Sequence, residues 1–113
     1  MPHIIIEHSP GLENTHDLQA LCDALWDKFA VHPSISGPDT VRTRTIAATA
    51  GRIGVEPQSF AHATLLLLPG RSEEIRADLA RIILDTLEAH LADVGSLTVR
   101  LSDIQQPYLK RML

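Results

Sequence analysis

The sequence predicts an α/β (α+β) fold: two tandem β-α-β units that form one four-stranded sheet, with two helices on one of its faces. Four apolar or β-branched runs alternate with two segments of helical periodicity, in the order strand, helix, strand, strand, helix, strand. The chain of 113 residues has the length of a single domain, 1–113. Because the order repeats, residues 2–51 and 59–104 are expected to form an architectural pseudo-repeat, with parallel strands in each half.

The first half begins with the strand Pro2–His8, in which three isoleucines follow one another. A helix capped by Asn14 or Thr15 follows, because its apolar residues recur at helical spacing. The second strand is expected over Thr40–Ala48, which is rich in β-branched residues. The apolar positions of the helix are Leu18, Leu21, Cys22, Leu25 and Phe29.

The second half follows a connecting segment, Gly51–Ser59, which fits either a plain loop or a short hairpin. The third strand is predicted over Phe60–Leu68. Ser72 is a good cap for the second helix, Gly95 is expected to close it, and Ser96–Ser102 is the fourth strand. The apolar stripe of this helix consists of Ile75, Leu79, Ile82, Ile83, Leu87 and Leu91.

Composition and charge exclude several classes of protein. The net charge is −4 at pH 7, so the chain offers no basic field for the phosphate backbone of a nucleic acid. Its longest apolar run, Leu65–Leu68, has four residues, far too few to span a membrane. No signal peptide is recognisable, and the one cysteine, Cys22, excludes an internal disulfide. We therefore expect a cytoplasmic protein.

Two of the predicted strands are apolar on both faces. In the third strand, Leu65 and Leu67 point to one face, and Leu66 and Leu68 point to the other. In the first strand, Ile5 points away from its two isoleucine neighbours. Strands of this kind are normally buried on both faces, whereas two helices cover only one. We therefore expect another subunit to cover the second face; the alternative is a coincidence of leucine-rich composition.

Four residues are candidates for chemistry. Pro2 becomes an amino-terminal secondary amine when Met1 is removed, and burial beside cations lowers the pKa of such an amine toward that of a general base. Arg42 and Arg44 are two residues apart on a strand, so both project to one face, where guanidinium groups suit a carboxylate. Arg71 lies in a Pro-Gly-Arg-Ser turn before a helix, a position that favours an anion.

The same residues also have plainer interpretations. Many proteins begin with Met-Pro and make no use of the proline. Arg42 and Arg44 also fit the edge or end of a strand that reaches solvent, and Arg71 also fits an exposed turn. The six histidines show no metal-ligand spacing. His62 is expected to be a hydrogen-bonded structural residue, and Cys22 to be a packing residue.

Several short motifs, in their order along the chain, resemble the 5-carboxymethyl-2-hydroxymuconate isomerase family of the tautomerase superfamily. The chain opens with Pro2 and His3, followed by three isoleucines and Glu7. Residues 41–44, Val-Arg-Thr-Arg, match the core of the family's Gly-x-x-Arg-x-Arg element, with Gly37 one or two residues too far upstream. The remaining matches are Phe60, His62, Thr64 and Leu65 in the third strand, then Gly70, Arg71 and Ser72, then Glu74 and Arg76.

This resemblance implies a homotrimer with inward-facing sheets, and an enzyme that needs neither a metal nor an organic cofactor. It implies that Pro2 is the general base, which moves a proton between carbons of an unsaturated 2-hydroxy or 2-oxo acid such as 5-carboxymethyl-2-hydroxymuconate. Arg42 and Arg71 carry over as residues that bind the substrate carboxylate and stabilise enolate charge. Arg44 is a second candidate for that role.

Two regions depart from the family pattern: the loop 48–59 lacks the family's aromatic residues, and the segment beyond Pro107 is shorter. Alternative functions therefore stay open beside the isomerase. One is a sister reaction on the same fold, such as dehalogenation or decarboxylation. An observed addition of water, in place of a 1,3-proton transfer, would favour this alternative. The other is a non-catalytic trimeric protein that binds small anions through Arg42 and Arg71, which persistence of Met1 on the native protein would favour.

Overall fold

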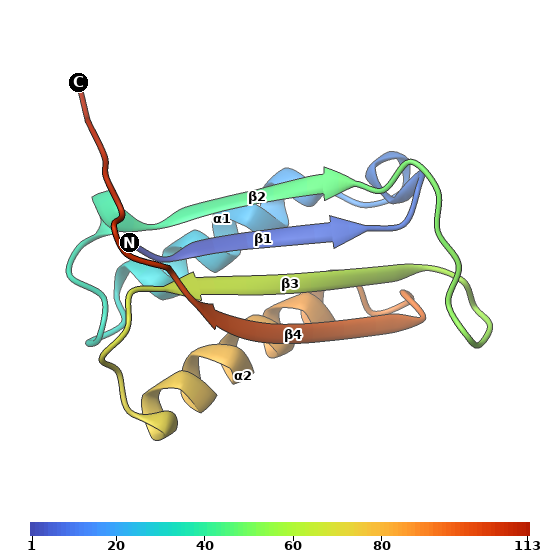
Figure 1. Cartoon of the computed structure of the whole chain (residues 1–113). Coiled ribbons are helices and arrows are strands. Elements are labelled where there is room, and N and C mark those ends of the chain that lie inside the picture. Colours follow the sequence, from blue (N-terminus) through green and yellow to red (C-terminus); the bar gives the residue numbers. More distant parts are fainter.

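The sheet consists of two β-α-β units joined side by side (Figure 1). The computed structural model describes residues 1–113. β1 (His3–His8) pairs in parallel with β2 (Arg42–Ala47), and β3 (Phe60–Leu67) pairs in parallel with β4 (Ser96–Asp103). β1 and β3 are antiparallel neighbours at the centre, which gives the strand order β2-β1-β3-β4. The predicted α+β class and the parallel pairing within each half are confirmed.

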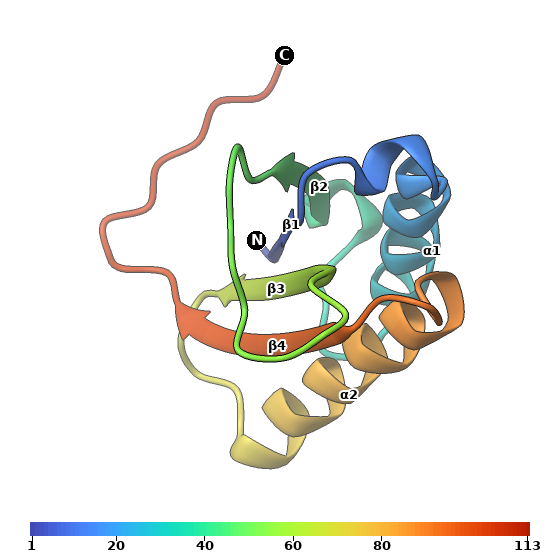
Figure 2. The same cartoon turned by 90° about the vertical axis from the view of Figure 1, so that its right-hand side faces the viewer.

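The helices α1 (Leu18–Ala30) and α2 (Glu73–His90) both lie on one face of the sheet, as predicted (Figure 2). Their apolar stripes pack against the side chains that β1 and β3 direct to that face, because alternate residues of a strand point to the same side. The structure contains no candidate for a membrane-spanning helix. The core residues with no exposed surface are Ile4, Ile6, Leu21, Leu25, Phe29, Ala61, Ala63, Leu65, Leu67, Leu79, Ile83 and Leu87.

The predicted cap of α1 is wrong. Asn14 lies in a short 3-10 helix, and the hydroxyl of Thr15 donates to the carbonyl of Leu12 at 3.3 Å. Asp17 caps the helix instead, because its side chain accepts a hydrogen bond from the backbone N–H of Ala20 at 3.0 Å. The helix therefore begins two to three residues later than expected.

The predicted end of α2 is also wrong. The helix ends at His90, and the N–H of Leu91 still donates to the carbonyl of Leu87 at 2.7 Å. Gly95 does not close the helix but leads into β4, where its N–H donates to the Ser59 hydroxyl at 2.9 Å. The connection between β2 and β3 contains no further strand, so it is a loop and not a hairpin.

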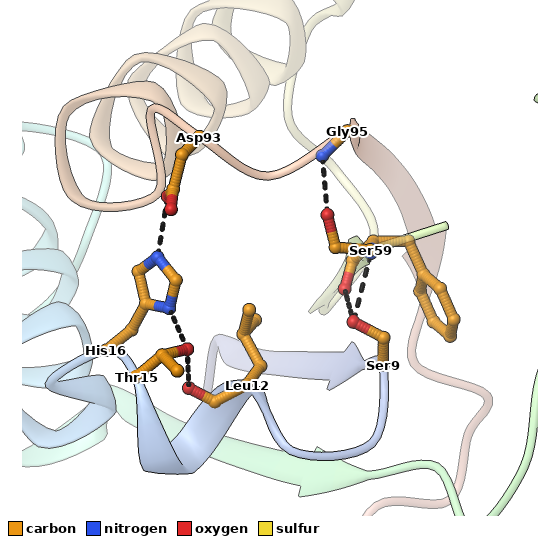
Figure 3. A network of polar contacts seen from close by, with 8 residues as sticks. Ser9, Leu12, Thr15, His16, Ser59, Asp93 and Gly95 are labelled. Atoms are coloured by element: carbon orange, nitrogen blue, oxygen red, sulfur yellow. Dashed lines mark hydrogen bonds and ion pairs between the residues drawn. The ribbon is translucent and has the colours of Figure 1, made fainter. Parts of the chain in front are cut away.

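The sheet has two differently built ends. We call the end formed by the starts of β1 and β2 and the finishes of β3 and β4 the site end, and the other the opposite end. Figure 3 shows the opposite end, where His16 and Asp93 join the start of α1 to the chain after α2 through a contact of 2.6 Å. There the Ser59 hydroxyl holds Gly95, and the hydroxyl of Ser9 accepts the N–H of Phe60 at 3.1 Å.

The face of the sheet away from the helices is mixed in character. The strand register places Ile5 and Leu66 on this face, and both are half-buried. The same register places polar and charged side chains beside them, so the face is only partly apolar, in contrast to the expectation from the isoleucine and leucine runs. The polar and charged residues of this face on β1, β2 and β3 are His3, Glu7, Arg42, Arg44, His62 and Thr64.

Candidate active site

The site end brings together the amino terminus and the start of the edge strand β2. Pro2 is buried, and its carbonyl oxygen accepts a hydrogen bond from the N–H of Arg42 at 3.0 Å. Pro2 therefore lies just before β1 rather than inside it, in contrast to the predicted strand. This backbone contact places the Arg42 residue next to the first residues of the chain.

Arg42 has no carboxylate partner within the chain. One of its Nη atoms donates to the carbonyl of Thr40 at 3.3 Å and lies 3.8 Å from the Sδ of Met1. The other lies 3.4 Å from the Sδ of Met112. Since a thioether is a weak acceptor, the guanidinium retains most of its capacity to bind an anion.

Arg71 reaches the site end from the turn before α2. Gly70 has φ of +121°, a backbone conformation that residues with a Cβ rarely adopt, and the Ser72 side chain accepts the N–H of Ile75 at 3.2 Å to start the helix. The two Nη atoms of Arg71 donate to the carbonyls of Leu68, at 3.3 Å, and Ser34, at 2.9 Å. Its Nε is buried without an acceptor.

The Ser34 carbonyl that holds Arg71 is itself fixed by His32. The Nδ1 of His32 accepts the backbone N–H of Ser34 at 3.1 Å and lies 2.9 Å from its hydroxyl. Because Nδ1 is an acceptor, the proton of a neutral ring lies on Nε2, which donates to Asp78 at 2.8 Å. This chain of contacts determines the position of the Arg71 guanidinium.

The electrostatic environment of the amino terminus favours the neutral form of an amine. Burial lowers the pKa of the α-amino group of Met1 below its usual value, and the positive charges of Arg71, Lys110 and Arg42 lower it further. The same three cations form no ion pair with any carboxylate of the chain. The site end can therefore hold an anion beside an amine.

Arg44 is directed to a different neighbour. It shares the uncovered face with Arg42, as the two-residue spacing predicts, but it is exposed, and its Nη1 donates to the Nδ1 of His3 at 3.2 Å. The Nε2 of His3 is 2.9 Å from the hydroxyl of Tyr108. Burial lowers the pKa of His3, and Arg44, Arg42 and the amino terminus lower it further.

The structure thus brings Pro2, Arg42 and Arg71 to one end of the sheet, and places Arg44 one step further along the face. Sequence reasoning missed Lys110, whose Nζ lies 3.3 Å from the Sδ of Met1. No local pattern reveals this contact, because the two residues are 109 positions apart.

The other candidate residues have structural surroundings. His62 hydrogen-bonds to the hydroxyl of Thr98 at 2.7 Å. Cys22 is a buried free thiol whose pKa is raised by burial, which suits a packing residue better than a nucleophile. No group of three or more His, Cys, Asp or Glu side chains is arranged to hold a metal ion.

The solved structures that this chain resembles place it in the tautomerase fold. Within that class the chain belongs to the 5-carboxymethyl-2-hydroxymuconate isomerase family, whose model matches residues 2–105. The predicted family is therefore confirmed. No individually curated protein sequence matches the chain.

Solved structures agree with this membership. A crystal structure of a 5-carboxymethyl-2-hydroxymuconate delta-isomerase has a TM-score of 0.83 and 22% identity, over 99% of this chain and 88% of that one. A 5-carboxymethyl-2-hydroxymuconate isomerase from Deinococcus radiodurans R1 has a TM-score of 0.82 and 23% identity, over 97% and 88%. A fused 4-OT wild-type symmetric trimer has a TM-score of 0.71 and 25% identity, over 95% and 89%.

Proposed function

We propose that this chain is a cofactor-independent tautomerase in which the amine of Pro2, freed by removal of Met1, is the general base. Its substrate is a small unsaturated 2-hydroxy acid with two or more carboxylates, such as 5-carboxymethyl-2-hydroxymuconate. The observation that supports this most strongly is that Arg42, Arg71 and Lys110 surround the amino terminus without a carboxylate partner of their own.

The proposed reaction is an internal proton transfer. The neutral amine of Pro2 takes the proton of the 2-hydroxyl group of the substrate. The resulting dienolate then shifts an electron pair toward a carbon of its own conjugated system. The ammonium returns the proton to that carbon, which gives the 2-oxo acid with no net gain or loss of atoms. Arg42 and Arg71 bind carboxylate and stabilise the negative charge that grows on the enolate oxygen.

The test compares two forms of the protein, one beginning at Pro2 and one that retains Met1. Ultraviolet absorbance follows the ketonisation of 2-hydroxymuconate-type dienols. We expect the Pro2 form to be active and the Met1 form to lose activity by at least about 100-fold, because an amide nitrogen cannot act as a base. Equal rates in the two forms would rule out the amine mechanism.

The same comparison separates catalysis from binding alone. A protein that only binds anions would bind the dienol through Arg42 and Arg71 in both forms and ketonise it in neither. Mass spectrometry of the native protein adds a direct control, because an enzyme of this type requires a population that begins at Pro2. A native protein that always keeps Met1 favours the binding function.

We also propose that the chain assembles as a homotrimer through the uncovered face of the sheet. Two features support this: Ile5 and Leu66 lie on that face, and Ile46 is 50% exposed there, and one structurally similar protein is described as a symmetric trimer. Light scattering at micromolar concentration is expected to give three times the chain mass of 12.4 kDa. A monomer under these conditions contradicts the proposal.

A further inference from the structure

The segment after β4 turns back across the site end. Figure 1 shows this carboxyl-terminal segment running past the amino terminus and the start of β2. Three of its side chains make contacts there. Tyr108 meets His3 at 2.9 Å, Lys110 meets the Sδ of Met1 at 3.3 Å, and Met112 meets Arg42 at 3.4 Å.

Lys110 and Arg42 converge on one atom. The Nζ of Lys110 lies 3.3 Å from the Sδ of Met1, and an Nη of Arg42 lies 3.8 Å from the same sulfur. Two cations directed at one point repel each other. A thioether offsets this repulsion poorly, because it is uncharged and a weak acceptor. A carboxylate at this position would satisfy both cations with charge-assisted hydrogen bonds.

We propose that Lys110 is a carboxylate-binding residue of the active site, and that it selects a dicarboxylic acid over a monocarboxylic one. Lys110 and Arg42 bind one carboxylate at the place that the sulfur of Met1 occupies. Arg71, whose charge also has no carboxylate partner in the chain, binds the other. This inference deepens the proposed function and rests on it, because removal of Met1 opens the position between Lys110 and Arg42.

The contact between Tyr108 and His3 holds Lys110 in place. The Nδ1 of His3 accepts from Arg44, so its Nε2 carries the proton of the neutral ring and donates to the Tyr108 hydroxyl. The two rings also meet edge to face, with centroids 6.0 Å apart. Tyr108 is thereby a positioning residue, two positions before the ammonium that it places.

The test measures binding rather than turnover, with protein that begins at Pro2. The probes are adipate, a saturated six-carbon dicarboxylate that has no dienol to tautomerise, and hexanoate, which lacks one of its carboxylates. Calorimetric titration gives the Kd of each. We expect Lys110→Gln to raise the Kd of adipate by about tenfold and to change that of hexanoate by less than about twofold, because one charge-assisted contact is lost.

Arg111→Gln is the matched control, because it removes the same charge from the adjacent exposed residue. It is expected to leave both Kd values unchanged. Tyr108→Phe, which keeps the ring but removes the hydroxyl, is expected to raise the Kd of adipate by less than Lys110→Gln does. An unchanged Kd for adipate in Lys110→Gln overturns the assignment. Two other results also overturn it: Lys110→Gln weakens the binding of adipate and hexanoate equally, or Lys110→Gln and Arg111→Gln weaken the binding of adipate equally.

The outcomes also separate this inference from the proposed function. A protein that binds adipate through Lys110 but ketonises no dienol refutes the proposed reaction and leaves the binding residue assigned. A protein that ketonises dienols while Lys110→Gln binds adipate normally refutes only the role of Lys110.

Discussion

The two ends of the sheet differ in the partners of their polar side chains. At the opposite end, His16 pairs with Asp93 at 2.6 Å, and the Ser59 hydroxyl holds the N–H of Gly95 at 2.9 Å. At the site end, Arg42 and Arg71 meet only backbone carbonyls and sulfur. The site end also holds a paired cation, because Arg76 meets Asp103 at the finish of β4 at 2.8 Å. The unpaired cations Arg42 and Arg71 are what distinguish this end, and they indicate a binding role.

This contrast has a physical basis. Cations that gather without counter-charges repel one another, and only the surrounding fold or an added anion offsets that repulsion. Natural proteins often depart from ideal local pairing at functional sites. Substitutions of the unpaired cations at the site end are therefore expected to change function, and substitutions at the opposite end to change stability.

The largest expected effect is that of Arg71→Gln. Loss of a preorganised cation beside the developing enolate is expected to reduce kcat/KM for a 2-hydroxymuconate by about 100-fold. The matched control is Arg76→Gln, because Arg76 pairs with Asp103 at 2.8 Å and does not contact the amine. Steady-state assays of both variants check this, and activity of Arg71→Gln within twofold of the parent protein would contradict the assigned role.

A stability effect is expected from Gly95→Ala at the opposite end. An added Cβ would lie 2.5 Å from the carbonyl oxygen of Pro57, so the loop must shift, which is expected to cost about 1–3 kcal/mol of unfolding free energy. Gly54→Ala is the control, since its Cβ meets no atom within 4 Å. Denaturant titration measures the loss, and kcat/KM at 25 °C should stay unchanged; a fall in kcat/KM would mean that the two ends are coupled.

A smaller functional effect is expected at His32, which acts through Arg71. In His32→Asn, the side-chain oxygen replaces Nδ1 as the acceptor for Ser34, whereas His32→Gln keeps a donor for Asp78 and loses that acceptor. We expect His32→Gln to raise KM by about tenfold, because the Ser34 carbonyl that holds Arg71 is released. We expect His32→Asn to raise KM much less, because it keeps the acceptor for Ser34. Equal KM values in the two variants would show that His32 does not position Arg71.

The smallest effect concerns Asp93 and its pH dependence. The hydrogen bond from His16 lowers the pKa of Asp93 below its usual value, so the folded state favours the carboxylate. The contribution of this carboxylate to folding stability is therefore fully present above the pKa that Asp93 has in the unfolded chain. It is lost as the pH falls through the lowered pKa. Asp93→Asn should therefore lower Tm by at most a few degrees at neutral pH. This difference should shrink toward pH 3; a constant difference in Tm contradicts the assignment.

Local patterns were sufficient to predict most of the fold. The period of two in Thr40–Ala48 placed Arg42 and Arg44 on one face, and Ser72 caps α2 as predicted. The cap of α1 was missed because Asn14, Thr15 and Asp17 all suit a cap, and only the packing of the 3-10 turn decides among them.

The site was predictable only in part. The grouping of Arg42 and Arg71 near Pro2 came from the family resemblance, since no periodicity links residues so far apart. Tyr108 and Lys110 gave no signal, because their partners at the amino terminus are 105 and 109 positions away. The division into halves 2–51 and 59–104 and the cytoplasmic location stay predictions.

The central claim is that the site end lowers the pKa of the Pro2 amine enough for it to act as a base. ¹⁵N NMR titration of protein that begins at Pro2 measures this pKa directly, against a short peptide beginning Pro-His-Ile-Ile. We expect a lower pKa in the protein than in the peptide, and a partial return toward the peptide value in Arg71→Gln. Equal pKa values in the protein and the peptide would contradict it.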